Sequence, residues 1–233
     1  MDLLERESSA PASSADVLFD RLRTVLYLHG FASSPGGRKV TALRELLEPR
    51  GLRVVAPDLN APSFRRLDFQ AMVRIALWEA RLLRPDVLVG SSLGSLVALA
   101  ASRRGIAAPL VLIAPAVGFG PRWTEKLPSE DPLTFLHHGE GREMPIHRSF
   151  FEDLASLDVD RDPPTHPVTI VMGAADESVP PELVRATWRC WEESGRLAEG
   201  SRYVEIDQGD HGLVDAVPRI ADEIVALTAV PSP

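Results

Sequence analysis

A serine flanked symmetrically by glycines stands in the segment GSSLG (residues 90–94). The G-x-S-x-G spacing is typical of a sharp turn from a strand into a helix, in which the serine projects from the edge of a sheet and can act as a nucleophile. Glycines two residues before and after it avoid the collisions that Cβ atoms would cause in so tight a turn. Ser92 lies midway between Gly90 and Gly94, whereas Ser91 has no such pair, so Ser92 is the candidate nucleophile. Taken alone, the pattern also fits a strand–helix turn that has only a structural role, or one that binds phosphate at the N-terminus of the helix.

A serine hydroxyl needs a base to take its proton and an acid to orient that base. With this type of turn the chain order is serine, acid, histidine. Of the histidines after Ser92, only His211 lies in a loop directly after an expected strand, in QGDHG (residues 208–212). It is therefore the candidate base. The paired His137 and His138 are interpreted as surface residues.

The candidate acid is Asp176, which directly follows the apolar run VTIVM (residues 168–172) and so lies at the same sheet edge. Its neighbour Glu177 is an alternative, as are Asp207 and Asp210, which flank the histidine in sequence. An aspartate next to the histidine rarely reaches behind the ring to orient it. The sequence therefore favours Asp176.

Two backbone N–H groups must also stabilise the negative charge that develops on the substrate carbonyl oxygen. Leu93, the residue after the nucleophile, is expected to supply one, and Phe31, in the loop after the first expected strand, the other. Gly30 would permit a close backbone approach there. His29 precedes the serine in the chain and is interpreted as an anchor of that loop.

Short apolar runs alternate with segments of helical periodicity along the chain. Nearly continuous apolar strands that alternate with helices are typical of a parallel sheet covered on both faces. The sequence predicts an α/β fold with a doubly wound, mainly parallel six-stranded sheet. The expected strands are Thr24–Leu28, Arg53–Ala56, Asp86–Val89, Pro109–Ala114, Val168–Met172 and Arg202–Ile206. The expected helices are Arg38–Glu48, Asp68–Leu83, Ser92–Arg104, Glu182–Glu193 and Val214–Leu227.

The predicted organisation is a flexible N-terminal arm (residues 1–20), with a helical turn at Ala15–Leu22, and one domain over residues 21–233. The alternation is interrupted at residues 116–167, far longer than the usual connection of about 2–6 residues. This connection leaves from the carboxyl end of a strand, where open α/β sheets bind ligands. We expect a helical, lid-like insertion with a helix near Ser149–Leu157; the alternative is a structural excursion.

The composition is that of a globular protein and narrows the classes of partner. The chain is 45% hydrophobic and 25% charged, and its net charge of −8 argues against a nucleic-acid partner. No apolar run reaches the roughly 20 residues that span a bilayer, and the first residues lack the apolar core of a signal peptide. We therefore expect a cytoplasmic protein with no membrane partner. Cys190, the only cysteine, is predicted to be a buried apolar residue at helical spacing.

Four segments together resemble the α/β-hydrolase superfamily: LHGFASSPGGRK (28–39), GSSLGS (90–95), MGAADESVP (172–180) and GDHGL (209–213). Within that superfamily the chain is most similar to the small bacterial YqiA-like (UPF0227) esterases. The resemblance implies a reduced α/β-hydrolase fold and carboxylesterase or thioesterase chemistry on small acyl substrates, with no cofactor.

The expected reaction is therefore hydrolysis of an acyl ester or thioester through an acyl-enzyme on Ser92. The insertion would limit the substrate to short or medium acyl chains. Its apolar residues within possible reach of the serine are Phe119, Trp123, Leu127, Phe135, Leu136, Phe150 and Phe151.

Other functions fit the sequence less well. The first loop lacks the Gly-Lys-Ser/Thr of a phosphate-binding loop, no G-x-G-x-x-G follows a strand, and no HExxH or comparable cluster predicts a metal site. A non-catalytic scaffold that binds a small ligand or a protein partner is the alternative, because fold alone does not establish catalysis. The presence of Ser92, Asp176 and His211 in the required order favours an enzyme.

Overall fold

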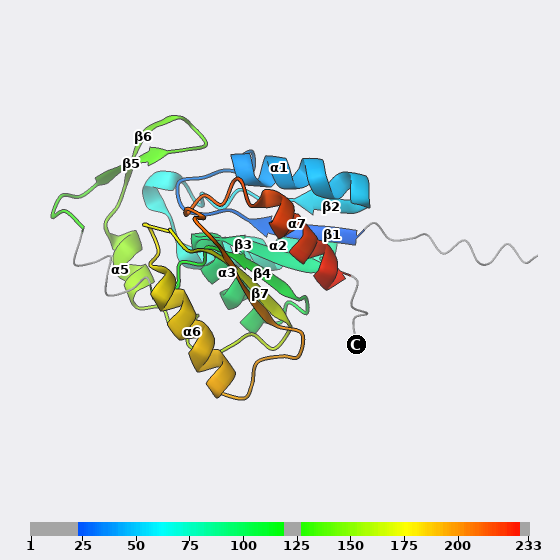
Figure 1. Cartoon of the computed structure of the whole chain (residues 1–233). Helices are drawn as coiled ribbons and strands as arrows, with labels where there is room; N and C mark the ends of the chain where they lie inside the picture. Colours follow the sequence, from blue (N-terminus) through cyan, green and yellow to red (C-terminus); the bar gives the residue numbers. More distant parts are fainter. Residues whose placement is uncertain (1–22, 119–126, 229–233) are drawn as a thin grey trace, which may run out of the picture.

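The computed structural model describes residues 23–118 and 127–228. They form a six-stranded sheet with helices on both faces and a small two-stranded sheet beside it (Figure 1). The strand order is β2-β1-β3-β4-β7-β8, and all neighbouring strands are parallel. The predicted α/β fold is thus confirmed. The predicted arm and its helical turn at Ala15–Leu22 lie outside the described residues.

The strand order also determines where a site can form. The strands are β1 (Arg23–Leu28), β2 (Leu52–Val55), β3 (Val87–Ser91), β4 (Leu110–Ile113), β7 (Val168–Gly173) and β8 (Arg202–Ile206). The chain runs outward from β1 to the edge strand β2 and then returns past β1 to β3. At such a reversal the loops after the two strands diverge, which opens a crevice at their carboxyl ends. The loop after β1 and the serine turn after β3 meet at this crevice.

The helices pack on the two faces of the sheet, and four of them do so in pairs. They are α1 (Arg38–Leu47), α2 (Phe69–Leu83), α3 (Leu93–Arg103), α6 (Pro181–Glu193) and α7 (Val217–Thr228), with short turns η1 (Glu48–Arg50) and η2 (Phe64–Arg66). Helix α1 contacts α7, and α2 contacts α3 (Figure 1). Helix α7 begins later than predicted, because the N–H groups of Ala216 and Val217 form turn hydrogen bonds to residues three positions earlier, before the helical bonds begin.

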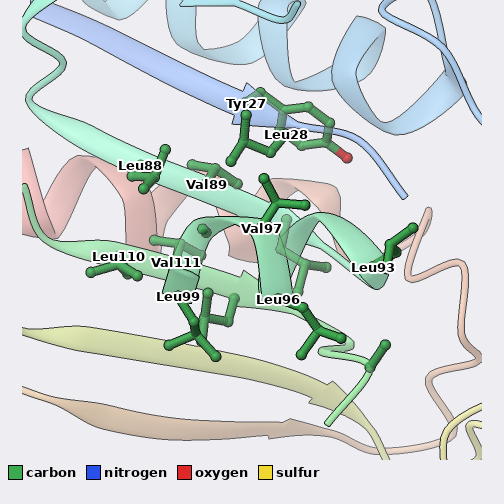
Figure 2. Close-up of a cluster of buried hydrophobic side chains, with 14 of the residues drawn as sticks. Tyr27, Leu28, Leu88, Val89, Leu93, Leu96, Val97, Leu99, Leu110 and Val111 are labelled. Atoms are coloured by element: carbon green, nitrogen blue, oxygen red, sulfur yellow. The ribbon is translucent and has the colours of Figure 1, made fainter. Parts of the chain in front are cut away.

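The core around α3 holds the serine turn rigidly. Every residue of α3 from Leu93 to Ser102 is buried, because α2 covers the face that the sheet leaves free. Figure 2 shows side chains of β1, β3, β4 and α3 in contact, among them Leu28, Leu88, Val97 and Leu110. Each fully buried aliphatic side chain of this kind stabilises the fold by roughly 1.5–3 kcal/mol.

The insertion differs from the predicted helical lid. Strands β5 (Leu133–His137) and β6 (Arg142–Ile146) form an antiparallel hairpin, and one short helix, α5 (Ser149–Ala155), follows. Only α5 corresponds to the predicted helix. The hairpin was not predicted because Pro145 lies inside β6, and proline argues against a strand. A two-stranded sheet has only edge strands, where proline is tolerated.

Cys190 is exposed, so the prediction of a buried cysteine is wrong. Helix α6 turns Val184, Trp188 and Trp191 toward the core. Successive helical residues are rotated by about 100°, which puts position 190 on the opposite side of the helix from Trp188.

Candidate active site

Ser92 occupies the sharp turn between β3 and α3, with φ 52° and ψ −117°. Such a backbone costs on the order of 1–3 kcal/mol and persists only where the surroundings determine it. Here the N–H of Ser92 donates to the carbonyl oxygen of Ile113 (2.9 Å), and its own carbonyl oxygen accepts from the N–H of Ser95 (2.9 Å). The turn is therefore fixed from both sides by the backbone.

The glycines around Ser92 are required by close backbone contacts. A Cβ atom at Gly94 would lie 2.1 Å from the carbonyl oxygen of Leu28, and one at Gly90 would lie 2.6 Å from the carbonyl oxygen of Gly94. A Cβ at Gly30 would lie 3.2 Å from the Cβ of Ser92. The first loop, β3 and α3 therefore approach one another more closely than other residues allow.

The loops after β7 and β8 bring Asp176 and His211 to the same sheet edge. Ser92 Oγ donates to His211 Nε2 (3.0 Å), and His211 Nδ1 donates to Asp176 Oδ2 (2.7 Å). Because Nδ1 faces a carboxylate, it carries the ring proton and leaves Nε2 free to accept one from the serine. The structure thus brings together the three residues that the sequence singled out.

Asp176 is held in one orientation by its own loop. Its side chain is fully buried, and Oδ1 accepts from the N–H groups of Ser178 and Val179, both at 2.8 Å. Glu177 is exposed, and Asp210 accepts a hydrogen bond from a backbone N–H of its own turn (2.8 Å). Asp207, the third alternative, is also exposed, and Asp176 is the only one of the four acids that hydrogen-bonds to the histidine ring.

The loop after β1 is anchored by His29. Its Nδ1 donates to the carbonyl oxygen of Gly30 (2.9 Å), and its Nε2 accepts from the N–H of Leu59 (2.9 Å). Burial lowers the pKa of His29, so the ring is neutral, as an acceptor nitrogen requires. The next residue, Phe31, and Leu93 after the serine have N–H groups with no hydrogen-bond partner among the described residues.

A cavity of about 340 Å³ opens onto Ser92 and His211. Phe31 forms one wall and packs edge-on against Phe135 of the hairpin, with ring centroids 5.2 Å apart. The hairpin is tied to the sheet by a hydrogen bond from the N–H of His138 to the carbonyl oxygen of Ala32 (2.7 Å). The other apolar lining residues include Leu93, Leu136, Phe150, Phe151, Leu154 and Val179.

The predicted apolar wall is therefore correct for Phe135, Leu136, Phe150 and Phe151. Leu127 packs against the core and does not line the cavity. Phe119 and Trp123 lie outside the described residues.

The prediction of two surface histidines is confirmed for His138, which is exposed, and wrong for His137. His138 lines the cavity, whereas His137 is buried against Phe64, with ring centroids 4.8 Å apart. His137 is the last residue of β5, and His138 is the first residue of the turn that follows it. Burial lowers the pKa of His137.

A polar cluster beneath the serine turn was missed by the sequence analysis. Lys39, in the first turn of α1, donates from Nζ to Ser91 Oγ (3.0 Å), and the Tyr27 hydroxyl also hydrogen-bonds to Ser91. Burial lowers the pKa of Lys39 to about 8 and raises that of Tyr27 to about 12. Ser91 does not line the cavity. A signal was present in the composition: of 25 lysines and arginines, only Lys39 and Lys126 are lysines.

A larger hollow of about 430 Å³ lies at the opposite, amino-terminal end of the strands. Its lining includes Arg81, Arg84 and Arg104 but no serine, cysteine or histidine. It therefore lacks a nucleophile. Within residues 23–118 and 127–228, no group of three or more histidine, cysteine or acidic side chains could hold a metal ion, and no helix could cross a membrane.

Comparisons with known proteins agree with this architecture. The model of a family described as "Uncharacterised protein family (UPF0227)" matches residues 24–228. No curated protein matches the chain. A protein of the α/β-hydrolase superfamily from Xanthomonas campestris pv. campestris is 28% identical, over 88% of this chain and 98% of that chain, with a TM-score of 0.57.

Two more distant structures are similar in fold. Est1E from Butyrivibrio proteoclasticus, solved with ferulic acid, is 19% identical over 89% of this chain and 90% of its own, with a TM-score of 0.72. The monoacylglycerol lipase of Paleococcus ferrophilus is 18% identical over 88% of this chain and 94% of its own, with a TM-score of 0.69.

Proposed function

The chain belongs to the uncharacterised protein family UPF0227 and has the α/β-hydrolase fold, and we propose that it is a serine hydrolase of carboxylic esters or thioesters. Ser92 is the nucleophile, His211 the general base and Asp176 the acid that orients the base. One observation carries the proposal: an unbroken hydrogen-bonded chain runs from Ser92 Oγ through His211 to the buried Asp176, at the mouth of an apolar cavity.

The reaction follows from these contacts. Ser92 Oγ attacks the acyl carbonyl carbon while His211 Nε2 takes the hydroxyl proton. The oxyanion that forms accepts hydrogen bonds from the N–H groups of Phe31 and Leu93, whose lack of other partners supports this role. The histidine then passes its proton to the leaving alcohol or thiol, which departs and leaves the acyl-enzyme. A water activated by the same histidine hydrolyses that ester and frees the serine.

The size of the cavity favours substrates with short to medium acyl groups. Its volume of about 340 Å³ lies near the lower end of the usual range for ligand pockets, about 300–1,000 Å³. We propose that residues 116–167 act as a cap of the domain, with Phe135 and Phe151 as the wall that a long chain would meet. The ferulic acid in Est1E makes aromatic acyl esters a second series to test. No cofactor takes part, and the cytoplasmic location stays a prediction from the sequence.

Labelling with a fluorophosphonate tests the proposal against a non-catalytic scaffold. Wild-type protein and Ser91→Ala should become labelled, and Ser92→Ala should not, with all three folded by circular dichroism. Removing a triad residue should lower turnover of p-nitrophenyl acetate by roughly 10⁴–10⁶-fold. Absence of labelling in folded wild-type protein would favour the scaffold.

A series of p-nitrophenyl esters from acetate to palmitate tests the acyl length. Each buried methylene of the substrate gains roughly 0.8 kcal/mol until the wall is met. Activity should therefore rise from acetate, reach a maximum at a modest chain length and then fall. Rates that continue to rise through palmitate would show that the insertion does not limit the substrate.

A further inference from the structure

The N–H group of Phe31, one of the two proposed oxyanion donors, belongs to the peptide unit between Gly30 and Phe31. In a trans peptide the carbonyl and the N–H lie in one plane and point in opposite directions. The carbonyl oxygen of Gly30 accepts from His29 Nδ1 (2.9 Å), and this bond therefore sets the direction of the Phe31 N–H as well. Whatever holds the ring of His29 also holds the donor.

The residue after Phe31 has a strained backbone. Ala32 has a φ of 54°, in the left-handed region, which is uncommon for a residue with a Cβ atom. Its side chain is buried, and its carbonyl oxygen accepts from the N–H of His138 at 2.7 Å. Strained conformations of this kind persist only where the surroundings determine them. The loop after β1 (residues 29–34) therefore depends on contacts with other segments to keep its shape.

Residues 58–64, the brace, follow the edge strand β2 and contact this loop at several points. The first contact acts on His29. The N–H of Leu59 donates to His29 Nε2 (2.9 Å), so the ring proton resides on Nδ1, which donates it to Gly30. The orientation of the proposed donor is thus tied, through one histidine ring, to the backbone of the brace.

Two side chains of the brace contact the loop at Phe31 and after it. Asn60 Nδ2 donates to the carbonyl oxygen of Ser33 (3.0 Å) and to Asp58 Oδ1 (2.8 Å), and the second bond fixes the orientation of the amide. The buried ring of Phe64 packs against the ring of Phe31, with centroids 5.5 Å apart. The brace therefore holds the loop before Phe31, at Phe31 and beyond it.

None of residues 58–64 lines the cavity that opens onto Ser92. Any effect of these residues on catalysis must therefore pass through the structure around them. The hydrogen bonds of the Asn60 side chain go only to the loop and to the brace itself, whereas Phe64 also contacts His137 of the hairpin. Asn60 therefore gives the cleaner variant.

We propose that Asn60 and Phe64 are positioning residues that aim the Phe31 N–H at the oxyanion; this rests on the function proposed above. The oxyanion exists only in the transition state and the tetrahedral intermediate. A loosened loop therefore weakens binding of the transition state and leaves binding of the uncharged substrate unchanged. A misplacement of about 1 Å, even from a change remote from the reacting atoms, can cost about 10²-fold in rate.

The test compares two ligands of the same size. A short alkyl trifluoromethyl ketone forms a bond from its carbonyl carbon to Ser92 Oγ, while the serine proton passes to His211 and the carbonyl electron pair becomes an oxyanion. The corresponding secondary alcohol occupies the cavity without forming an adduct. The ratio of the two dissociation constants therefore reports on the oxyanion donors alone.

The variants are Asn60→Ala and Phe64→Leu, with Ser63→Ala, at an exposed position of the brace, as the control. Loss of an oxyanion donor costs about 10²–10³-fold in kcat, so a donor that is retained but misdirected should weaken the ketone by about 10-fold. Affinity for the alcohol should stay unchanged in Asn60→Ala. The kcat/KM for p-nitrophenyl acetate and for longer esters should fall by the same factor as the ketone affinity. Ser63→Ala should match wild type.

A role confined to folding would lower the active fraction and leave the ratio of the two dissociation constants unchanged. An unchanged ratio in folded Asn60→Ala overturns the proposal, whether or not Phe64→Leu folds. Wild-type protein separates this outcome from failure of the hydrolase proposal. If it binds the ketone covalently and takes up the fluorophosphonate, only the positioning role has failed; if it does neither, both proposals are overturned.

Discussion

The serine turn and the insertion (residues 116–167) face the same cavity, but their conformations are fixed by different kinds of interaction. The turn is fixed by backbone: glycines without room for a Cβ, a strained φ at Ser92, and hydrogen bonds to the neighbouring strand. The insertion is fixed by side chains, chiefly a cluster of phenylalanines around Phe31. Backbone constraints tolerate almost no substitution, whereas aromatic packing tolerates exchange of one apolar group for another. We therefore expect the chemistry to depend on the rigid half and the acyl preference on the adaptable half.

Among substitutions that leave Ser92 and His211 in place, the largest effect should come from Asp176→Asn in the rigid half. The amide oxygen can still accept from Ser178 and Val179, which leaves its NH₂ group facing Nδ1 of His211. The ring would then adopt the wrong tautomer, with Nε2 protonated, and kcat should fall by about 10⁴-fold. Glu177→Gln, in the exposed neighbour, is the matched control. If Glu177→Gln were the more damaging variant in steady-state assays, the acid would be misassigned.

A smaller but still severe effect should follow Gly94→Ala. Its Cβ would collide with the carbonyl oxygen of Leu28 at 2.1 Å, so β1 and α3 must separate. Overpacking usually costs about 1–3 kcal/mol, and a backbone collision should reach the top of that range or exceed it. Gly36→Ala, whose Cβ would meet only Ser34 Oγ at 3.9 Å, is the control. Urea unfolding compares the two, and equal midpoints would contradict a turn fixed by backbone.

The sequence predicted the rigid half because its constraints are local. Each of its features can be recognised within a short stretch of consecutive residues: the glycines around Ser92, the apolar runs, and the loops that follow these runs. Parallel strands then bring those loops to one edge of the sheet. The hairpin was not predictable in this way, since β5 and β6 pair through Pro145 and pack against residues distant in sequence such as Phe64 and Ala32.

Lys39 was missed for a related reason. Its significance depends on Ser91, Asp176 and Asp210, which the fold brings together from three other segments. Its position two residues into a predicted helix resembles that of any solvent-exposed base. Only the rarity of lysine in this chain distinguished it before the structure was known.

The polar cluster beneath the serine turn should also affect how the stability of the protein depends on pH. The pKa of Lys39 is lowered to about 8 in the folded state, against about 10.4 in an unfolded chain, so between these values the unfolded state binds more protons. Its contribution to the free energy of unfolding should therefore rise with pH, by roughly 1–3 kcal/mol between pH 8 and 10. Urea titrations of wild type and Lys39→Met measure the difference. If the free energy of unfolding changed with pH in the same way in both proteins, Lys39 would be exposed to solvent in the folded state, as the charged residues of the hairpin are.

The smallest effect should come from the adaptable half, in Phe135→Ala. Loss of one ring from the cavity wall should lower kcat/KM for the preferred ester by about 10-fold, which corresponds to about 1.4 kcal/mol. Hydrolysis of p-nitrophenyl acetate, too short to reach the ring, should change little. Thr134→Ala, at the exposed neighbouring position of β5, is the control. An equal loss for acetate and for longer esters would show that the ring supports the serine turn and not the acyl group.

The proposed mechanism requires that Ser92 carries the acyl group during turnover. The most direct test is to quench the protein with acid during hydrolysis of a p-nitrophenyl ester, so that the acyl-enzyme present during turnover is trapped. Mass spectrometry of the digested protein then locates the acyl group within the peptide that contains Ser91 and Ser92. We expect an acyl ester on Ser92 that is absent in Ser92→Ala. An acyl group on Ser91 or elsewhere, or full turnover by Ser92→Ala, would contradict it.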